Sequence, residues 1–228
     1  MSEKNFKLLV FDWDGTLMDS APRIVASFEA AMSDLNLEKR LPAQISHVIG
    51  LSLDKAITTL FPAASTQQCL QLADRYRHHF LSNQALAAPL FPGVAETLQN
   101  LETAGYWLAI ATGKSRKGLS RALAESQLTN LFHSTRCADE TSSKPNPQML
   151  QEIMDELGMQ PSDTLMIGDT EYDLQMAHNA GVGAVAVSYG VHDQARLCQC
   201  NPLICIDSFS ALPAWLHQGK KTLCQKSN

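Results

Sequence analysis

Short apolar runs alternate with helix-like stretches along most of this chain of 228 residues. The runs lie at residues 8–11, 107–111, 165–167, 184–187 and 203–206, with a weaker candidate at 132–137. A strand buried in a parallel sheet is a continuous apolar run, and strands that alternate with helices build a doubly wound sheet. The pattern therefore predicts an α/β fold with a mostly parallel sheet.

The stretches between these runs show the spacing of amphipathic helices. Apolar residues recur every three to four positions and stop at a glycine, which is typical of a helix and its end. One such set is Val94, Leu98 and Leu101 before Gly105, and another is Met149, Ile153 and Leu157 before Gly158.

Residues 18–88 interrupt the alternation and contain no convincing strand. Ser20 is placed to cap a first helix with Pro22 in its first turn. A second helix is expected at residues 52–60 and a third at 66–81. The apolar stripe of the first is Ile24, Phe28, Ala31 and Leu35, and one side of the third carries Leu70, Ala73, Tyr76 and Phe80. We predict an all-helical insertion at 18–88 in a core made of residues 1–17 and 89–228, to which the chain returns at Pro89 and Pro92-Gly93.

Two aspartates, Asp12 and Asp14, follow the first apolar run directly. Ligands of an open parallel sheet bind beyond the carboxyl ends of its strands. Two carboxylates at such an end repel each other unless a cation offsets their charge. An aspartate turn that only closes the strand would explain the pair equally well, because Asp14-Gly15 is a common turn signal.

Three further segments fall at comparable places and favour the functional interpretation. Thr112 and Gly113 end the strand at 107–111, and Lys144 lies just before the helix that holds Met149. Asp169 ends the strand at 165–167, and Asp173 follows one helical turn later. Each segment taken alone could have a purely structural explanation, as a helix cap or a solvated charge. Together, in this order, they predict one site.

These four segments, in this order, resemble the haloacid dehalogenase-like phosphatases over nearly the whole chain. Residues 11–22 are similar to the opening of phosphoglycolate phosphatase-like members, and the helical insertion stands where that branch has its mobile cap. The resemblance implies a Rossmann-like core, a Mg²⁺ cofactor and hydrolysis through an aspartyl-phosphate. One position departs from the branch: a basic residue usually precedes the motif lysine, and here it is Ser143. This difference weakens the identity of the substrate, not that of the reaction.

The resemblance also implies catalytic roles. Asp12 attacks phosphorus, and Asp14 protonates the leaving oxygen and later activates water. Thr112 and the amide of Gly113 hold a phosphoryl oxygen, while Lys144 neutralises Asp12 and the phosphate. The presence of Asp14 favours phosphoryl transfer over dehalogenation, since a halide leaving group needs no proton and dehalogenase members lack this second aspartate. A carboxylate is an adequate nucleophile, but it repels a phosphate dianion by about 4 kcal/mol per charge pair at 4 Å and an effective dielectric of 20.

Cations must offset that repulsion. An all-oxygen set of aspartates suits Mg²⁺ better than zinc. The resemblance implies that the ligands are Asp12, the backbone carbonyl of Asp14, and Asp169. Asp173 either ligates the ion directly or orients its water.

Composition limits the partners. The formal charge is −5 and no basic run is present, which argues against nucleic acid. No segment spans a bilayer, and the start lacks a signal-peptide layout, so a cytoplasmic protein is expected. The spacing of Cys198, Cys200 and Cys205 misses the usual zinc patterns, which favours buried or half-buried thiols. The oligomeric state is not readable.

The expected function is hydrolysis of a small phosphate monoester, with glycolate, sugar or nucleotide leaving groups all open. A phosphomutase of the β-phosphoglucomutase type shares the motifs and the insertion. A non-catalytic phosphate-responsive module, like a receiver domain, is the alternative of another class. Such a module needs neither Asp14 nor a long insertion after the first strand.

Overall fold

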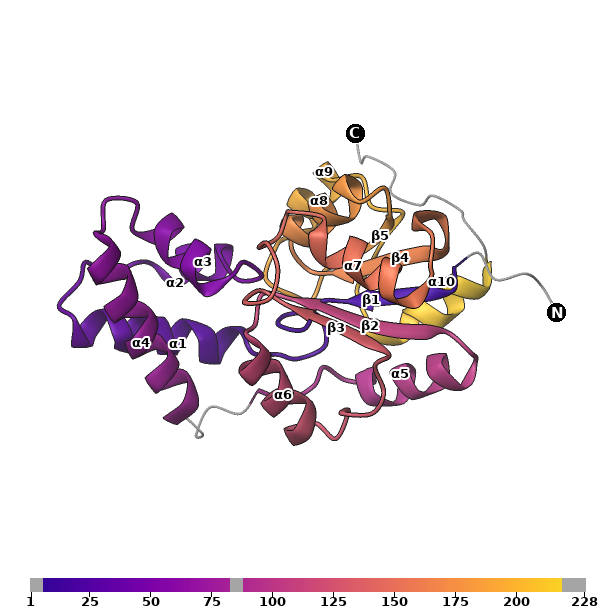
Figure 1. The fold of residues 1–228 in the computed structure, drawn as a ribbon, viewed down its shortest axis with the longest axis horizontal. Helices are drawn as coiled ribbons and strands as arrows, with labels where there is room; N and C mark the ends of the chain where they lie inside the picture. Colours follow the sequence, from indigo (N-terminus) through magenta and orange to yellow (C-terminus); the bar gives the residue numbers. More distant parts are fainter. Residues whose placement is uncertain (1–5, 83–87, 219–228) are drawn as a thin grey trace.

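The computed structural model describes residues 6–82 and 88–218, and these contain a six-stranded, wholly parallel sheet (Figure 1). The strand order is β3-β2-β1-β4-β5-β6. The strands are β1 (Leu8–Phe11), β2 (Trp107–Thr112), β3 (Ser134–Cys137), β4 (Thr164–Gly168), β5 (Gly183–Val187) and β6 (Ile204–Ile206). Each predicted strand is present, and the predicted α/β class is confirmed. Residues 1–5, 83–87 and 219–228 of the predicted core and insertion lie outside the described residues.

The central position of β1 brings the expected site residues to one edge of the sheet. Phe11 pairs with Ile110 of β2 on one side and with Ile167 of β4 on the other. The three strands therefore end side by side. The residues that follow them are placed at the carboxyl edge, where ligands of such sheets bind.

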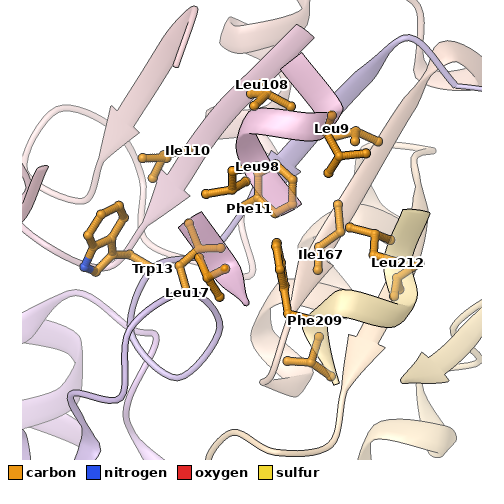
Figure 2. Close-up of a cluster of buried hydrophobic side chains, with 14 of the residues drawn as sticks. Leu9, Phe11, Trp13, Leu17, Leu98, Leu108, Ile110, Ile167, Phe209 and Leu212 are labelled. Carbon is orange, nitrogen blue, oxygen red and sulfur yellow. The ribbon is translucent and has the colours of Figure 1, made fainter. Parts of the chain in front are cut away.

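Alternate residues of β1 pack against helices on opposite faces of the sheet. Leu9 and Phe11 belong to an apolar cluster with residues of α5, α6 and α10, including Leu98 and Leu212 (Figure 2). Leu8 and Val10 face residues of α7 and α8 instead. The helices of this part are α5 (Val94–Thr103), α6 (Arg116–Glu125), α7 (Gln148–Leu157), α8 (Glu171–Asn179), α9 (Gln194–Gln199) and α10 (Leu212–Gln218), with short 3₁₀ turns η1 (Pro161–Asp163) and η2 (Phe209–Ala211). Both faces are covered, which explains why the strands read as continuous apolar runs.

Among the described residues, four helices between β1 and α5 form a separate group beside the sheet, which we call the helical segment (Figure 1). They are α1 (Ala21–Asp34), α2 (Pro42–His47), α3 (Leu53–Leu60) and α4 (Thr66–Ser82). The segment has an apolar cluster of its own that includes Phe28, Ile57 and Leu72. Within the described ranges, no helix has both the length and the apolar character needed to cross a membrane.

Three details of the helical segment differ from the sequence-based expectations. Leu70 was expected on the apolar side of α4 but is 65% exposed, and Leu72 is buried there instead. Ser20 occupies the N-cap position of α1, but its hydroxyl makes no capping bond and donates to Asp14. The short helix α2 was not predicted, because six residues provide too few turns for an apolar period to emerge.

Candidate active site

Lys144 binds two of the predicted acids at the centre of the site. Its Nζ lies 2.6 Å from Asp12 Oδ1 and 2.6 Å from Asp173 Oδ1, and all three side chains are buried. Burial opposes the charge of Lys144, but the two carboxylates raise its pKa above the ordinary value. The loop before α7 thus delivers a cation to the end of β1.

Asp169 is buried at the end of β4 and accepts two hydrogen bonds. Thr16 Oγ1 donates to Asp169 Oδ1 at 2.8 Å, and the amide of Val191 donates to Oδ2 at 2.9 Å. Burial and the nearby Asp173 raise the pKa of Asp169 to about 7. Burial, with Asp173 and Asp169, also raises the pKa of Asp12 well above its usual value, despite Lys144. Burial and the neighbouring carboxylates therefore disfavour the charged forms of these acids.

The acids fit a bound divalent cation. Among the described residues, Asp12, Asp169 and Asp173 form the one set of three or more possible ligands whose oxygen atoms all lie within 4.8 Å of one another. Asp12 Oδ2 is buried and has no hydrogen-bond partner in this part of the chain. A buried carboxylate oxygen without a partner is costly unless it binds an ion or substrate. Because all these donors are oxygen, the set suits a hard cation.

The carboxylate of Asp14 lies outside this group and is held by different partners. Lys114 Nζ contacts Asp14 Oδ1 at 2.7 Å and Oδ2 at 2.8 Å, and the Ser20 hydroxyl donates to Oδ1. Lys114 also lies over the ring of Phe80, 5.0 Å from its centre. Asp14 therefore stands between the sheet and the helical segment.

Thr112 and Gly113 end β2 at the same edge. Thr112 is buried, and its hydroxyl accepts from the amide of Lys114 at 3.2 Å. The helix-capping alternative for Thr112 does not hold, since the hydroxyl of Ser115 caps α6. Gly113 approaches the helical segment so closely that a Cβ there would lie 2.6 Å from the carbonyl oxygen of Gly50. The glycine thus permits contact with the segment beside the expected phosphate position.

The helical segment and the core line a cavity of about 650 Å³ beside Asp14. Two hydrogen bonds join the helical segment to the core. The amide of Ser52 donates to Ser143 Oγ at 2.9 Å, and the hydroxyl of Tyr172 donates to the carbonyl of His47 at 3.0 Å. Ser143, the residue that departs from the branch pattern, therefore links the lysine loop to the start of α3.

Comparison with known proteins identifies the family to which this chain belongs. The model of the haloacid dehalogenase-like hydrolases matches residues 9–187, which include every acid of the site. The chain belongs to the haloacid dehalogenase-like hydrolase family. It is 35% identical to the probable phosphatase IndB of Dickeya dadantii, over 92% of this chain and 93% of the relative. It is 30% identical to the phosphoglycolate phosphatase of Aliivibrio fischeri, over 95% and 99%.

A solved structure supports the same family assignment for this hydrolase. The predicted phosphoglycolate phosphatase of Haemophilus somnus has a TM-score of 0.86 and 26% identity, over 94% of this chain and 99% of that one. The resemblance to the phosphoglycolate phosphatase-like branch is thereby confirmed. The chain is a phosphoric monoester hydrolase.

Sequence reasoning missed the groups that hold the acids. Thr16 binds Asp169, Ser20 and Lys114 bind Asp14, and Thr170 donates to Asp173 Oδ2 at 2.7 Å. Threonine, serine and lysine are common in loops, so their identity alone carries little signal. Lys114 stands directly after Gly113 and is the one that its position in the motif could have identified.

Proposed function

We propose that this hydrolase is a Mg²⁺-dependent phosphatase that cleaves a small-molecule phosphate monoester through an aspartyl-phosphate on Asp12. The observation that supports it most is the state of Asp12. Its Oδ1 is fixed by Lys144, while its buried Oδ2 has no partner among the described residues. One oxygen is oriented and the other is free to bind or attack.

The residues take the following roles in this proposal. An oxygen of Asp12 attacks phosphorus, and the ester oxygen leaves with a proton from Asp14. Asp14 then takes a proton from water, which attacks the aspartyl-phosphate and releases phosphate and free Asp12. Lys144 offsets the charge of Asp12, and Thr112 and the amide of Gly113 hold a phosphoryl oxygen.

Asp12, Asp169 and Asp173, with the carbonyl of Asp14, are the proposed ligands of Mg²⁺. When bound, the ion offsets the negative charge of the carboxylates and the phosphate. The raised pKa of Asp12 and of Asp169 supports this assignment, because burial and the neighbouring carboxylates disfavour the charged forms, and a bound cation would offset that cost.

We further propose that residues 18–88 act as a cap over a core of 1–17 and 89–228. The cavity lies between the helical segment and the edge of the sheet, and both line it. A cap that closes there excludes water during the transfer and selects the leaving group.

The test is turnover of an aryl phosphate by the Asp12→Asn and Asp14→Asn variants. Each is expected to lose at least about 10³-fold in kcat, since the proposed nucleophile and proton donor are removed. Asp155→Asn changes an exposed aspartate on α7 and serves as the matched control. Normal turnover by Asp12→Asn would refute the nucleophile.

Metal removal tests the cofactor separately. EDTA should abolish turnover by the wild-type enzyme, and added Mg²⁺ should restore that turnover. Restoration by zinc but not by magnesium would contradict the proposed ion.

A further inference from the structure

The cavity beside Asp14 is present in a structure in which the helical segment contacts the core. The segment already contacts the core through Ser52–Ser143 and His47–Tyr172. The backbone of Gly50 also lies against Gly113. With these contacts in place, about 650 Å³ remain between the helical segment and the core. This volume falls within the range of pockets that enclose drug-sized ligands, about 300–1,000 Å³.

One wall of the cavity is aromatic. Phe28 of α1 and Tyr76 and Phe80 of α4 line it. The rings of Phe28 and Tyr76 are 4.5 Å apart between centres, and Tyr76 stacks on Phe80 at 5.8 Å with an interplanar angle of 27°. Burial, and secondarily Asp14, raise the pKa of Tyr76, so its phenol stays neutral. Phe28 is buried, whereas Tyr76 and Phe80 are half-buried, so these two rings form the accessible part of the wall beside Asp14.

Two cations lie against the same wall. The guanidinium of Arg23 is 4.6 Å from the centre of the Phe80 ring and donates to the Phe80 carbonyl at 2.6 Å. Lys114 approaches the same ring from the core. Planar, electron-rich bases are bound in proteins by stacking on aromatic rings and guanidinium planes.

We propose that the leaving group of the substrate is a nucleoside, whose base lies against the wall formed by Phe28, Tyr76 and Phe80. This inference rests on the proposed phosphatase function and narrows its substrate class. The reaction is hydrolysis of a nucleoside 5′-monophosphate. Water supplies the oxygen that stays on phosphorus, the bond from phosphorus to the 5′ oxygen breaks, and that oxygen takes the proton from Asp14.

A two-carbon acid such as glycolate matches this cavity poorly. It would fill a small part of the 650 Å³ and would leave the accessible parts of Tyr76 and Phe80 in contact with water. Apolar surface that stays in contact with water contributes nothing to binding, whereas a stacked base removes that surface from water.

The experiment compares kcat/KM for four esters with full-length enzyme and Mg²⁺: adenosine and uridine 5′-monophosphates, ribose 5-phosphate and 2-phosphoglycolate. Ribose 5-phosphate keeps the sugar and the ester but lacks the base. We expect at least one nucleotide to exceed ribose 5-phosphate by on the order of ten-fold, and to exceed phosphoglycolate as well. Preference for phosphoglycolate or ribose 5-phosphate would overturn the inference while leaving the phosphatase function intact.

A ring-deleting variant tests the wall itself. Tyr76→Leu keeps apolar bulk but removes the stacking surface, so the ratio of nucleotide to ribose 5-phosphate should fall towards one. Trp107→Leu is the matched control, because Trp107 is 41% exposed at the start of β2 and does not line the cavity. A ratio that Tyr76→Leu leaves unchanged would exclude the proposed base position.

Binding to the Asp12→Asn protein separates the two proposals. If the wild type released phosphate from none of the esters, the phosphatase function would fail. Calorimetry with Mg²⁺ and each ester would still report on the wall. There the nucleotide should bind about ten-fold more tightly than ribose 5-phosphate, and equal affinities would refute the inference.

Discussion

The side chain of Asp169 fits at the carboxyl edge because small residues surround it. A Cβ added to Gly190 would lie 2.2 Å from Asp169 Cβ. The next residue, Val191, donates its amide to the same carboxylate. Gly190 follows β5 and is remote in sequence from every motif, so nothing in the sequence marks it as part of the site.

Gly190→Ala should therefore displace Asp169 and weaken Mg²⁺ binding by about 10–100-fold, as loss of a group that orients a metal ligand does. Calorimetric titration with Mg²⁺ measures the effect. Gly118→Ala on α6 is the control, because its nearest contact would be Ser115 Oγ at 3.3 Å. Equal Mg²⁺ affinities of the wild type and Gly190→Ala would show that Asp169 is not a ligand.

The strands and the longer helices could be predicted because each has a pattern that depends only on its own residues. The run before Asp12 reads as a buried strand whatever its partners are. The exposure of Leu70 and the bond from Ser20 to Asp14 depend on how α1 and α4 pack, which no local period encodes. The acids of the site could be placed for the same reason as the strands: each follows a recognisable strand end. The hydroxyls and Lys114 that orient them could not, since their partners come from distant segments.

Helix α2 is joined to α8 and α9 through a cluster with two histidines. The carbonyl of His47 accepts from the Tyr172 hydroxyl and contacts His192 Nε2 at 3.3 Å, and the two imidazole rings stack at 5.6 Å. Arg196 contacts the ring of His47 and forms an ion pair with Glu171. Burial, with Arg196, lowers the pKa of both histidines below 6.5. Both are therefore neutral in the docked state at neutral pH.

Docking of α2 should weaken on acidification. An unfolded histidine binds a proton more readily than these two, so their stabilising contribution is present above pH 6.5 and is lost as pH falls below it. We expect the free energy of unfolding to fall from pH 7 to pH 5.5 more steeply in the wild type than in His192→Gln. The difference should stay below about 1.4 kcal/mol per pH unit, the limit for one proton. Urea unfolding at both pH values measures it, and parallel slopes would contradict the assignment.

Across the whole molecule, the acids at the carboxyl edge change the stability of the metal-free protein with pH in the direction opposite to that of the two histidines. A carboxyl whose pKa is raised by folding stabilises the metal-free protein below the unfolded pKa, and that contribution is lost as pH rises through the folded pKa. For Asp169 the window runs from 3.8 to about 7. The metal-free enzyme therefore loses stability at this edge over the range in which the histidine cluster gains it.

Mg²⁺ should reverse that loss, because its ligands must be ionised to bind it. We expect the Mg²⁺ affinity to rise by up to ten-fold per pH unit from pH 5.5 to 7 and to level off above the pKa of Asp169, about 7. Calorimetry in two buffers of different ionisation enthalpy reports both the affinity and the proton released. Asp169→Asn should bind Mg²⁺ more weakly and release less proton at pH 6. An affinity that stays flat from pH 5.5 to 7.5, with no proton released, would mean that these acids are ionised before the metal arrives, and that the charge of Lys144 suffices to hold them so.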